Sequence, residues 1–372
     1  MNSKKEVFMP RIARVALNGF GRIGRHIFRS LFSAQWCQIV GVCVRNELKL
    51  QDRLYDLKHD PYYGSEESVM SISADEHMAE FVCGSTRIPF FQVGDSKWEK
   101  CTADIIIDCS GVKSFSEIEP LARYAERVVV TRPVKEARMV IFGVNHEWYD
   151  SSARIVSAGS CTTNCVVPIL YPFIREKRFT LLECSGVTVH SATLSQKTLG
   201  TLEQIVDHNT GASFAVEEVF PFLRGKTMFS AFRVPTAEVS CLELNCRFDP
   251  VPDPADIYYT LQCASESYLT GILKLVSVPK KKDMSGSYRK KSYSAIVNTE
   301  SIVRASMGSL IKIHAWYDNE YAYSSRVVDL VKYIARIERF TDDTSAEKFI
   351  HEYIPPLQDD DMYNFPKGDE AL

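Results

Sequence analysis

Several classes of protein are disfavoured by what this sequence of 372 residues lacks. It contains no run of about 18 apolar residues, which is the length that a membrane-spanning helix requires. Residues 1–10 carry charge but no apolar stretch, so we expect no secretory signal. The formal net charge is only −3, so we expect neither nucleic acid nor a membrane as a partner.

Zinc-type cysteine pairs and a disulfide framework are missing as well. Cys161 and Cys165 stand on one helical face, but no second Cys/His pair has zinc-ligand spacing, so we expect no metal site. The eleven cysteines are an odd number and are spread thinly along the chain. Together with the missing signal segment, this predicts reduced thiols and a cytoplasmic location.

A glycine-rich turn between a strand and a helix is the first positive feature. Residues 14–17 predict a short strand, and residues 18–24, Asn-Gly-Phe-Gly-Arg-Ile-Gly, fit the pattern G-x-G-x-x-G. Apolar residues then recur at helical spacing up to Phe32, and residues 38–44 predict a second strand. Such a unit is typical of dinucleotide binding, with the pyrophosphate at the helix N-terminus. The alternative is a purely structural glycine turn.

The end of the second predicted strand leaves NAD and NADP both open. The dinucleotide fingerprint has an acidic residue here, which hydrogen-bonds the ribose hydroxyls. Glu47 can serve if the strand ends one residue later, whereas with Asn46 in that place the acid is missing and Arg45 favours a 2′-phosphate. A solvated loop without a role is a third interpretation. We expect NAD, with NADP as the alternative.

The first half of the chain alternates strands with helices. Strands are predicted at 105–107, 128–130, 139–144 and 155–156, and a helical pattern at 116–127. Such alternation is typical of a doubly wound parallel sheet. The segment Asp108-Cys109-Ser110-Gly111 follows the first of these strands and is predicted to form a loop over the cofactor.

Past residue 161 the predicted strands are longer and dominate. They lie at 181–190, 228–234, 239–248 and 310–317, with one helix at 255–267 and a helical pattern again at 321–337. We therefore expect an α/β protein with a Rossmann-type parallel-sheet domain and a second, α+β domain whose sheet is mostly antiparallel.

Between the two halves stands a small-residue turn, Ser-Ala-Gly-Ser-Cys-Thr-Thr-Asn-Cys at 157–165. A predicted strand ends before it and the apolar segment 166–173 follows it, so Cys161 is predicted to lie at a helix start. The free N–H groups and partial positive charge of a helix N-terminus favour a thiolate, which is the nucleophilic form of cysteine. Packing is the commoner role of a single cysteine, so the context has to decide.

His190, at the end of the strand 181–190, is the candidate partner for this thiol. An imidazole titrates near neutral pH and accepts a proton, although a core or surface histidine is the alternative. Groups that suit phosphate oxygens stand near it or downstream, at Thr193, Lys197, Thr210, Gly211 and Arg233.

Six segments in one order along the chain resemble the glyceraldehyde-3-phosphate dehydrogenase family. They are 18–25, 160–165, 188–190, 196–198, 232–236 and 316–320, of which Ser-Cys-Thr-Thr-Asn-Cys is highly specific. The resemblance implies a phosphorylating oxidoreductase with an α+β catalytic domain. The predicted boundaries are 11–160 for the NAD(P)-binding domain, 161–318 for the catalytic domain, 319–340 for a C-terminal helix that returns to the first domain, and 341–372 for a tail extension.

The resemblance also implies roles at matching positions. Cys161 attacks the aldehyde, His190 accepts the hydroxyl proton as hydride leaves for the nicotinamide, and inorganic phosphate then converts the Cys161 thioester to an acyl phosphate. The backbone N–H of Cys161 stabilises the oxyanion, and Tyr317 flanks the pair. The predicted substrate-binding residues, for the aldehyde phosphate and for inorganic phosphate, are Ser160, Thr162, Thr193, Lys197, Thr210, Gly211 and Arg233. The predicted cofactor-binding residues are Asn18, Gly19, Phe20, Gly21, Arg22, Ile23, Gly24, Asn46, Glu47, Ser110, Gly111 and Asn319.

The sequence also departs from the family pattern. The family implies a homo-oligomer, a tetramer, but the connection 198–209 is much shorter than the family's loop at the tetramer contact and the cofactor pocket. Gly159 replaces an Asn of the family, and a Lys-rich insert at 280–291 is interpreted as a solvated loop. Two other functions stay open. One is an erythrose-4-phosphate-type aldehyde dehydrogenase, because Asn46-Glu47-Leu48 resembles that branch, and the other is a non-catalytic binding or regulatory protein.

Overall fold

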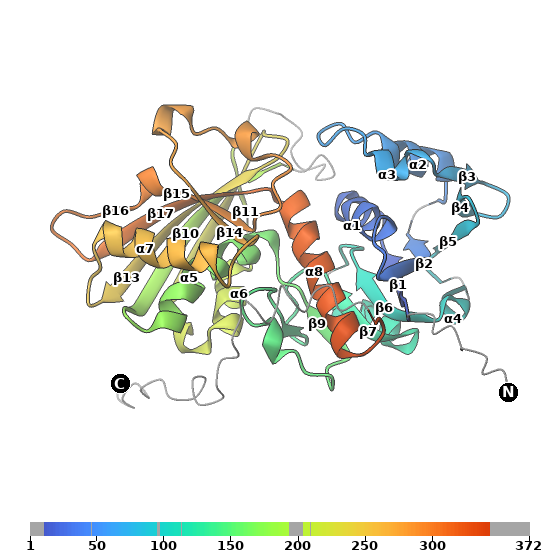
Figure 1. The fold of residues 1–372 in the computed structure, drawn as a ribbon, viewed down its shortest axis with the longest axis horizontal. Helices are drawn as coiled ribbons and strands as arrows, with labels where there is room; N and C mark the ends of the chain where they lie inside the picture. Colours follow the sequence, from blue (N-terminus) through green and yellow to red (C-terminus); the bar gives the residue numbers. More distant parts are fainter. Residues whose placement is uncertain are drawn as a thin grey trace, which may run out of the picture.

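The computed structural model describes residues 11–45, 47–94, 97–112, 114–192, 204–208 and 210–342. Within them, two sheets lie side by side, with the helix α8 (Tyr321–Ile337) between them (Figure 1). Three predicted site residues lie outside the described residues, namely Asn46, Thr193 and Lys197. Most of the connection 198–209 and nearly all of the predicted tail lie outside them as well.

The first sheet has the strand order β3-β4-β5-β2-β1-β6-β7-β9-β8. Its strands are β1 (Ala13–Asn18), β2 (Cys37–Val44), β3 (Ser73–Asp75), β4 (Glu80–Cys83), β5 (Thr86–Gln92), β6 (Ala103–Asp108), β7 (Ala125–Val130), β8 (Arg138–Met139) and β9 (Ile155–Ser157). All neighbours from β5 to β8 pair in parallel, and only β3 and β4 add antiparallel pairs at one edge. The predicted Rossmann-type sheet is therefore confirmed.

The helices of this half follow the strands, as the alternating pattern predicts. They are α1 (Arg22–Phe32), α2 (Leu50–Lys58), α3 (Glu67–Met70) and α4 (Lys97–Cys101), with 3₁₀ helices at Phe115–Glu117, Glu119–Arg123 and His146–Trp148. Central strand residues such as Ile106 and Val128 have no exposed surface, which is typical of a parallel sheet covered on both faces.

The second sheet has the order β11-β12-β10-β13-β17-β15-β14, with β16 paired to β17. Its strands are β10 (Thr180–Ser191), β11 (Val206–His208), β12 (Thr227–Val234), β13 (Ser240–Asp249), β14 (Leu273–Val276), β15 (Ala295–Asn298), β16 (Val303–Arg304) and β17 (Leu310–Tyr317). Among the described pairs, β10–β12 and β14–β15 are parallel and the others antiparallel, so the mostly antiparallel prediction is confirmed.

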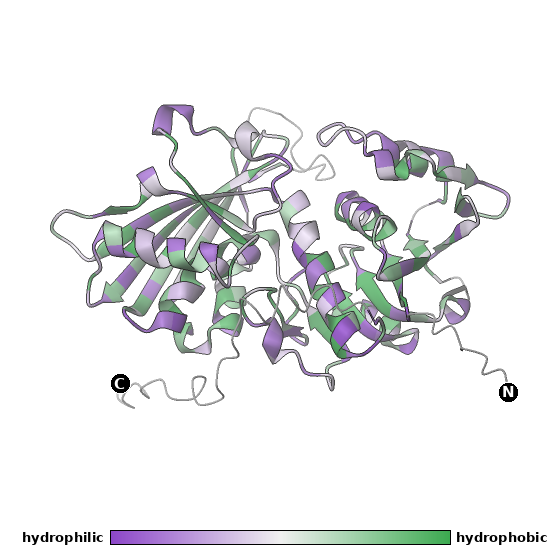
Figure 2. Cartoon of the chain, in the orientation of Figure 1, coloured by the Kyte–Doolittle hydropathy of each residue, from purple (hydrophilic) through white to green (hydrophobic). Residues whose placement is uncertain are grey.

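One face of the second sheet carries helices and a hydrophobic core. The helices are α5 (Cys161–Glu176), α6 (Ala212–Val219) and α7 (Pro254–Glu266), and further 3₁₀ helices lie at Pro221–Leu223, Lys280–Lys282, Ser285–Tyr288 and Thr299–Ser301. Buried and less buried residues alternate along β13 and β17, and Figure 2 shows the matching alternation of hydropathy. A strand that buries only one face requires this period of two.

Two predicted elements differ from the structure. The helical pattern at 116–127 forms two 3₁₀ helices, because Pro120 lacks a backbone N–H and residues 125–127 pair with β6 instead. The predicted strand 139–144 ends at Met139. Beyond it, the Asn145 side chain accepts a hydrogen bond from the backbone N–H of Ile141 at 2.6 Å, which holds the chain in a turn.

Helix α8 joins the second sheet to the core of the first. It begins just after β17, and its buried residues Val327, Leu330 and Ile334 pack in the core of the first sheet. The predicted return of the C-terminal helix thus agrees with this packing. In the described part of the chain, no helix is long and apolar enough to cross a membrane.

This packing predicts that Ile334→Ala lowers the free energy of unfolding by about 2–5 kcal/mol, because Ile334 is 0% exposed and its removal leaves a cavity. The matched control is Ile337→Ala on the same helix. It should change the free energy of unfolding by less than about 0.5 kcal/mol, because Ile337 is 45% exposed. Denaturant unfolding measures both. Equal effects of the two variants would contradict the placement of α8.

Candidate active site

Cys161 is the first residue of α5 and lies where two cores meet. Ser160 is the N-cap, and its Oγ accepts a hydrogen bond from the Thr163 N–H at 3.1 Å. The partly buried Cys161 packs against the hydrophobic cores of both sheets. Gly159, before the N-cap, has a φ of +68°, a left-handed conformation that glycine adopts readily.

The thiol faces the predicted histidine. Cys161 Sγ lies 3.3 Å from His190 Nε2, and His190 Nδ1 lies 2.9 Å from the Ser191 carbonyl oxygen. A carbonyl only accepts hydrogen bonds, so this contact favours the tautomer with the proton on Nδ1 and leaves the Nε2 lone pair facing the thiol. The structure thus brings together the two residues predicted as nucleophile and base.

Arg233 lies beside the same imidazole because β10 and β12 pair in parallel with His190 opposite Arg233. Its Nη1 contacts His190 Nδ1 and donates to the Ser191 carbonyl at 3.0 Å. A guanidinium can only donate, so its contact with Nδ1 favours the opposite tautomer. The position of Arg233 therefore bears on which imidazole nitrogen carries the proton.

Burial keeps both partners neutral. It raises the pKa of the Cys161 thiol, and the Arg233 guanidinium opposes this shift. Burial also lowers the pKa of His190 to about 3, and Arg233 adds to that shift. A neutral imidazole is the form that accepts a proton from the thiol. Cys165, one turn further along α5, is 0% exposed and its pKa is raised well above the usual value by burial, as expected for a packing residue.

Behind the pair lies a network of buried hydroxyl groups. Tyr317 OH lies 2.6 Å from Thr188 Oγ1 and 3.0 Å from Thr162 Oγ1, and its ring stands edge-on to His190 at 6.1 Å. Tyr317 thus flanks the pair. Thr162, predicted to bind substrate, is only 5% exposed and its hydroxyl contacts Tyr317, which indicates a supporting role instead.

Asn319 precedes α8 and has a fixed orientation. Its Oδ1 accepts hydrogen bonds from Ser191 Oγ at 2.9 Å and from Ser240 Oγ at 3.1 Å. The two serine hydroxyls thus fix which way the amide of Asn319 points.

The candidate phosphate residues Thr210 and Gly211 precede α6. The N–H of Ala212, the first residue of α6, donates to Thr210 Oγ1 at 3.2 Å. Strand β11 pairs with β12 so that Val206 stands opposite Arg233, which brings this segment alongside the arginine strand. The antiparallel register then runs away from Arg233, since His208 stands opposite Ala231 and Ser213 Oγ accepts from the Phe229 N–H, so Val206, and not Thr210 or Gly211, lies beside the arginine.

The glycine loop has the geometry that its motif predicts. Gly19 has a φ of +114°, and an added Cβ would lie 2.6 Å from the Cys109 carbonyl group. A Cβ on Gly24 would lie 2.5 Å from the Gly19 oxygen, whereas one on Gly21 would meet nothing within 4 Å. The first and third glycines thus permit close packing, and the second leaves room for a pyrophosphate, so the loop fits a dinucleotide.

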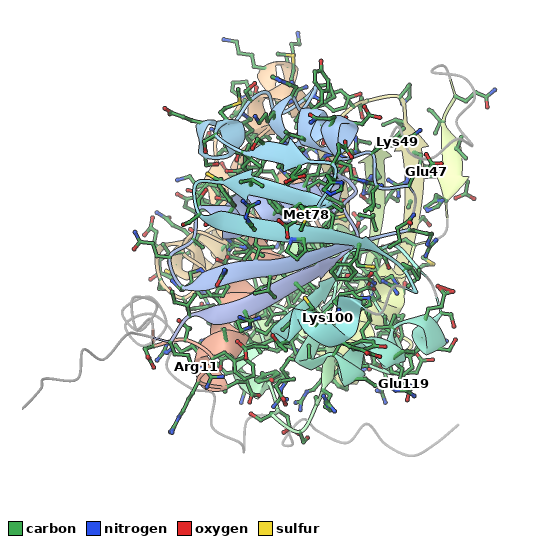
Figure 3. All side chains as sticks on the ribbon, turned by 90° about the vertical axis from the view of Figure 1, so that its right-hand side faces the viewer. Arg11, Glu47, Lys49, Met78, Lys100 and Glu119 are labelled. Atoms are coloured by element: carbon green, nitrogen blue, oxygen red, sulfur yellow. The ribbon has the colours of Figure 1, made fainter. Side chains whose placement is uncertain are left out.

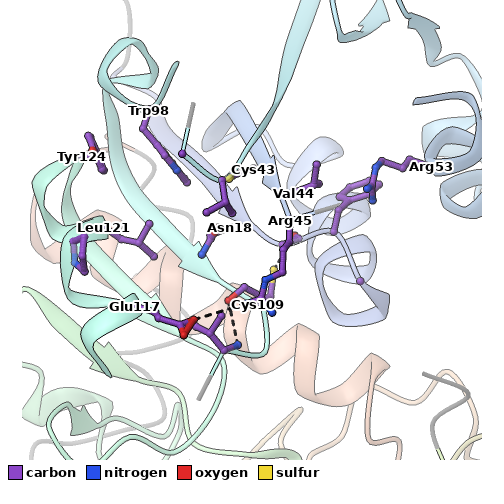
Figure 4. A pocket seen from close by; sticks show the side chains of 18 of the residues that line it. Asn18, Cys43, Val44, Arg45, Arg53, Trp98, Cys109, Glu117, Leu121 and Tyr124 are labelled. Carbon is purple, nitrogen blue, oxygen red and sulfur yellow. Dashed lines mark hydrogen bonds and ion pairs between the residues drawn. The ribbon is translucent and has the colours of Figure 1, made fainter. Parts of the chain in front are cut away.

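A cavity of about 1010 Å³ opens at the carboxyl ends of β1, β2 and β6 (Figure 4). Ligands of open α/β sheets bind at this edge. The predicted residues that line it are Asn18, Gly19, Phe20, Gly21 and Ser110. The predicted residues that do not line it are Arg22, Ile23, Gly24, Glu47, Gly111 and Asn319. Sequence reasoning missed Arg53, Trp98, Glu117 and Tyr124 in its wall, because no motif marks them.

The ribose end of this cavity carries basic side chains. Arg45 and Arg53 line it, and Arg45 Nη2 lies 3.8 Å from Glu117 Oε2 (Figure 4). Glu47, predicted as the ribose acid, lies at the rim, where its side chain is 77% exposed and pairs with Lys49 at 3.1 Å (Figure 3). At this edge the structure therefore brings Arg45, and not Glu47, to the cavity.

The charge of Arg233 predicts the reactivity of Cys161. Arg233→Ala should slow alkylation of Cys161 by iodoacetamide near neutral pH, roughly tenfold for each unit by which the thiol pKa rises. Arg233→Lys keeps the charge and should keep most of the rate. Mass spectrometry of the labelled peptide measures the rate of Cys161 alkylation. The control is Arg247→Ala, which removes an exposed strand arginine that pairs with Glu183. An unchanged rate in Arg233→Ala would refute the effect.

Comparison with known proteins agrees with this geometry. Two family models match: glyceraldehyde 3-phosphate dehydrogenase, NAD binding domain, over residues 13–115, and its C-terminal domain over residues 160–319. A glyceraldehyde-3-phosphate dehydrogenase of Neurospora crassa is 32% identical over 353 residues, covering 88% of this chain and 98% of that protein. Glyceraldehyde-3-phosphate dehydrogenase 3 of Saccharomyces cerevisiae is 33% identical over 347 residues, covering 87% of this chain and 100% of that protein.

These matches confirm the predicted family, fold class and NAD cofactor. The chain belongs to the glyceraldehyde-3-phosphate dehydrogenase family of NAD-dependent oxidoreductases.

Proposed function

We propose that this chain oxidises glyceraldehyde 3-phosphate to a thioester on Cys161. Inorganic phosphate then cleaves the thioester, and the product leaves as an acyl phosphate. The observation that carries the proposal is the 3.3 Å contact between Cys161 Sγ and His190 Nε2 at a helix N-terminus. A thiol and a proton acceptor in direct contact form the basic unit of cysteine nucleophilic catalysis.

The proposed steps assign each proton. His190 Nε2 takes the thiol proton as sulfur attacks the aldehyde carbon, and the resulting oxyanion is stabilised by the backbone N–H of Cys161 and protonated to a hemithioacetal. His190, neutral again, then accepts the hydroxyl proton as the carbon loses hydride, which leaves a thioester. Bound NAD supplies the hydride acceptor. Hydrogen phosphate attacks the thioester carbon through an oxygen and releases its proton to solvent, and the Cys161 thiolate leaves and takes back the proton held by His190.

Arg233 has two proposed functions in this cycle. It binds a phosphate group, together with Thr193 for the substrate phosphate, while Ser160, Thr210 and Gly211 hold the attacking phosphate. When Arg233 turns toward a phosphate, its contact with His190 Nδ1 is lost and the Ser191 carbonyl alone sets the tautomer. Substrate binding would then prepare His190 as a base.

The cofactor site and the larger organisation belong to the same proposal. The glycine loop holds the pyrophosphate and Asn319 Nδ2 meets the nicotinamide carboxamide. The NAD(P)-binding domain spans 11–160, the catalytic domain 161–318 and the returning helix 319–340. The homo-oligomeric state and the cytoplasmic location of the enzyme stay predictions.

NADP is a second candidate cofactor because Arg45 and Arg53 line the ribose end while Glu47 lies at the exposed rim. Arg53 donates to the carbonyl oxygens of Leu48 at 2.7 Å and of Glu47 at 2.8 Å, which fixes its guanidinium there. Arginine is well suited to a 2′-phosphate.

The principal test is NADH formation from glyceraldehyde 3-phosphate with and without phosphate. Without phosphate, the wild type should form about one equivalent of NADH per site and then stall, because the thioester accumulates. Cys161→Ser should form none, and Cys263→Ser is the control. Acyl release that ignores phosphate would favour the erythrose-4-phosphate-type reaction instead. No NADH or NADPH formation at all would favour a non-catalytic protein.

The cofactor question has a separate test by direct binding. Arg45→Ala should weaken NADP binding roughly tenfold, equivalent to one lost charged contact, and leave NAD binding nearly unchanged. Arg87→Ala, whose guanidinium pairs with Glu80 on the neighbouring strand, is the matched control. Calorimetric titration of each variant with both cofactors measures this. If Arg45→Ala binds NADP as the wild type does, Arg45 has no role toward a 2′-phosphate.

A further inference from the structure

A cluster of buried acidic side chains lies where α1, the turn after α2, and the start of α8 meet. Tyr63 belongs to the first-sheet half, Glu238 connects β12 to β13, and Asp318 follows β17. Their exposed fractions are 2%, 3% and 1%. Tyr63 OH lies 2.6 Å from Glu238 Oε2 and 2.7 Å from Asp318 Oδ1.

The number of protons at this junction is constrained. A phenol has one hydrogen, so it donates to only one of two carboxylate oxygens. The other carboxyl oxygen faces the phenol oxygen at a hydrogen-bond distance, and an ionised carboxylate cannot donate. A proton on one of the two carboxyl groups lets both contacts be full hydrogen bonds.

The neighbours of each group indicate which one carries it. Asp318 Oδ1 accepts from the backbone N–H groups of Glu320 at 3.1 Å and Tyr321 at 2.8 Å, and Oδ2 accepts from the N–H of Lys290 at 2.9 Å. Three backbone donors stabilise an ionised carboxylate. Among the described residues, Glu238 has, besides Tyr63, only a 3.4 Å contact with Arg22, which also pairs with Glu320. The proton thus belongs on Glu238.

We propose that protonated Glu238 is a positioning residue, which donates a hydrogen bond to Tyr63 while Tyr63 donates one to Asp318. This series of hydrogen bonds holds the glycine loop and Asn319 in place for the cofactor. Arg22, the first residue of α1, lies within the glycine loop 18–24, and Asn319 stands between Asp318 and Glu320. When Glu238 ionises, two carboxylates compete for one phenolic hydrogen. The phenol then keeps only one of its two contacts, so the connection between Glu238, which contacts Arg22 of the glycine loop, and Asp318, next to Asn319, is broken and cofactor affinity falls. The inference rests on the proposed role of Asn319.

The charged surroundings place this ionisation near neutral pH. Burial raises the pKa of Glu238 to about 7, with the Tyr63 hydrogen bond and Arg22 opposing the shift and Asp318 and Asp60 adding to it. Burial and the charge of Glu238 also raise the pKa of Glu320 to about 8. Glu320 faces Arg22 and lies 3.8 Å from His26, whose pKa burial lowers to about 3, so His26 stays neutral in this range.

The sign of the stability effect follows from the raised pKa. The folded chain holds a proton on Glu238 that the unfolded chain releases above its lower, ordinary pKa. The contribution of Glu238 to stability is therefore complete at acidic pH and is lost as pH rises toward and through about 7. Glu238→Gln keeps a donor at this place at every pH, so it removes this dependence.

The test is the dissociation constant of NAD at about pH 6 and about pH 8.5, measured by calorimetry on the full chain. The wild type should bind roughly tenfold more weakly at the higher pH, the change that one lost charged contact produces. Glu238→Gln should bind with the low-pH affinity at both values, and Tyr63→Phe should bind weakly at both. Glu243→Gln, an exposed carboxyl on β13 paired with Lys312, should follow the wild type.

Two further measurements do not depend on NAD. The infrared band of a protonated carboxyl group at neutral pH should be weaker in Glu238→Gln than in the wild type. The melting temperature of the wild type should fall relative to that of Glu238→Gln as pH rises through about 7. A pH dependence of NAD affinity that persists unchanged in Glu238→Gln, or an unchanged infrared band, would overturn the proposal. If NAD fails to bind at all, the role of Asn319 fails, while the infrared and melting results still decide where the proton lies.

Discussion

The contact between the Cys161 thiol and the His190 imidazole depends on the start of the helix α5 and the end of the strand β10. The thiol is held at the start of α5 by the N-cap of Ser160, while the imidazole is held at the end of β10 by the Ser191 carbonyl. The parallel pairing of β10 with β12 then adds Arg233 to the same place. Since all three groups are at least partly buried, each changes the proton affinity of the others more than it would in water.

Contacts around Cys161 and His190 connect these two residues with the half of the molecule that carries the cofactor cavity. Cys161 packs against both hydrophobic cores, and Ser191, next to His190, donates to Asn319 at the start of α8. Helix α8 in turn packs in the core of the first sheet. The position of the reacting sulfur and the position of the cofactor site are thus fixed by one continuous set of contacts.

The cofactor cavity illustrates a division of roles along the sequence. The backbone at Gly19 and Gly21 forms its floor, and side chains from α2, α4 and the 3₁₀ helices after β6 form its walls. The floor is common to dinucleotide sites. The walls include the two arginines of the cavity, Arg45 and Arg53.

Local pattern was enough to predict the glycine turn, the helix start at Cys161, both kinds of sheet and the pairing of Cys161 with His190. These features depend on residue spacing and on short-range backbone chemistry, which a sequence displays directly. The helix expected at 116–127 and the strand at 139–144 were wrong, because Pro120 lacks a backbone N–H, residues 125–127 pair with β6, and the Asn145 side chain accepts from the N–H of Ile141. Only the tertiary structure placed Glu47 at the exposed rim, buried the hydroxyl of Thr162 against Tyr317, and set Tyr63 between two carboxyl groups from far along the chain. Such contacts join residues whose separation in sequence carries no periodic signal, so only the packing of the two sheets brings them together.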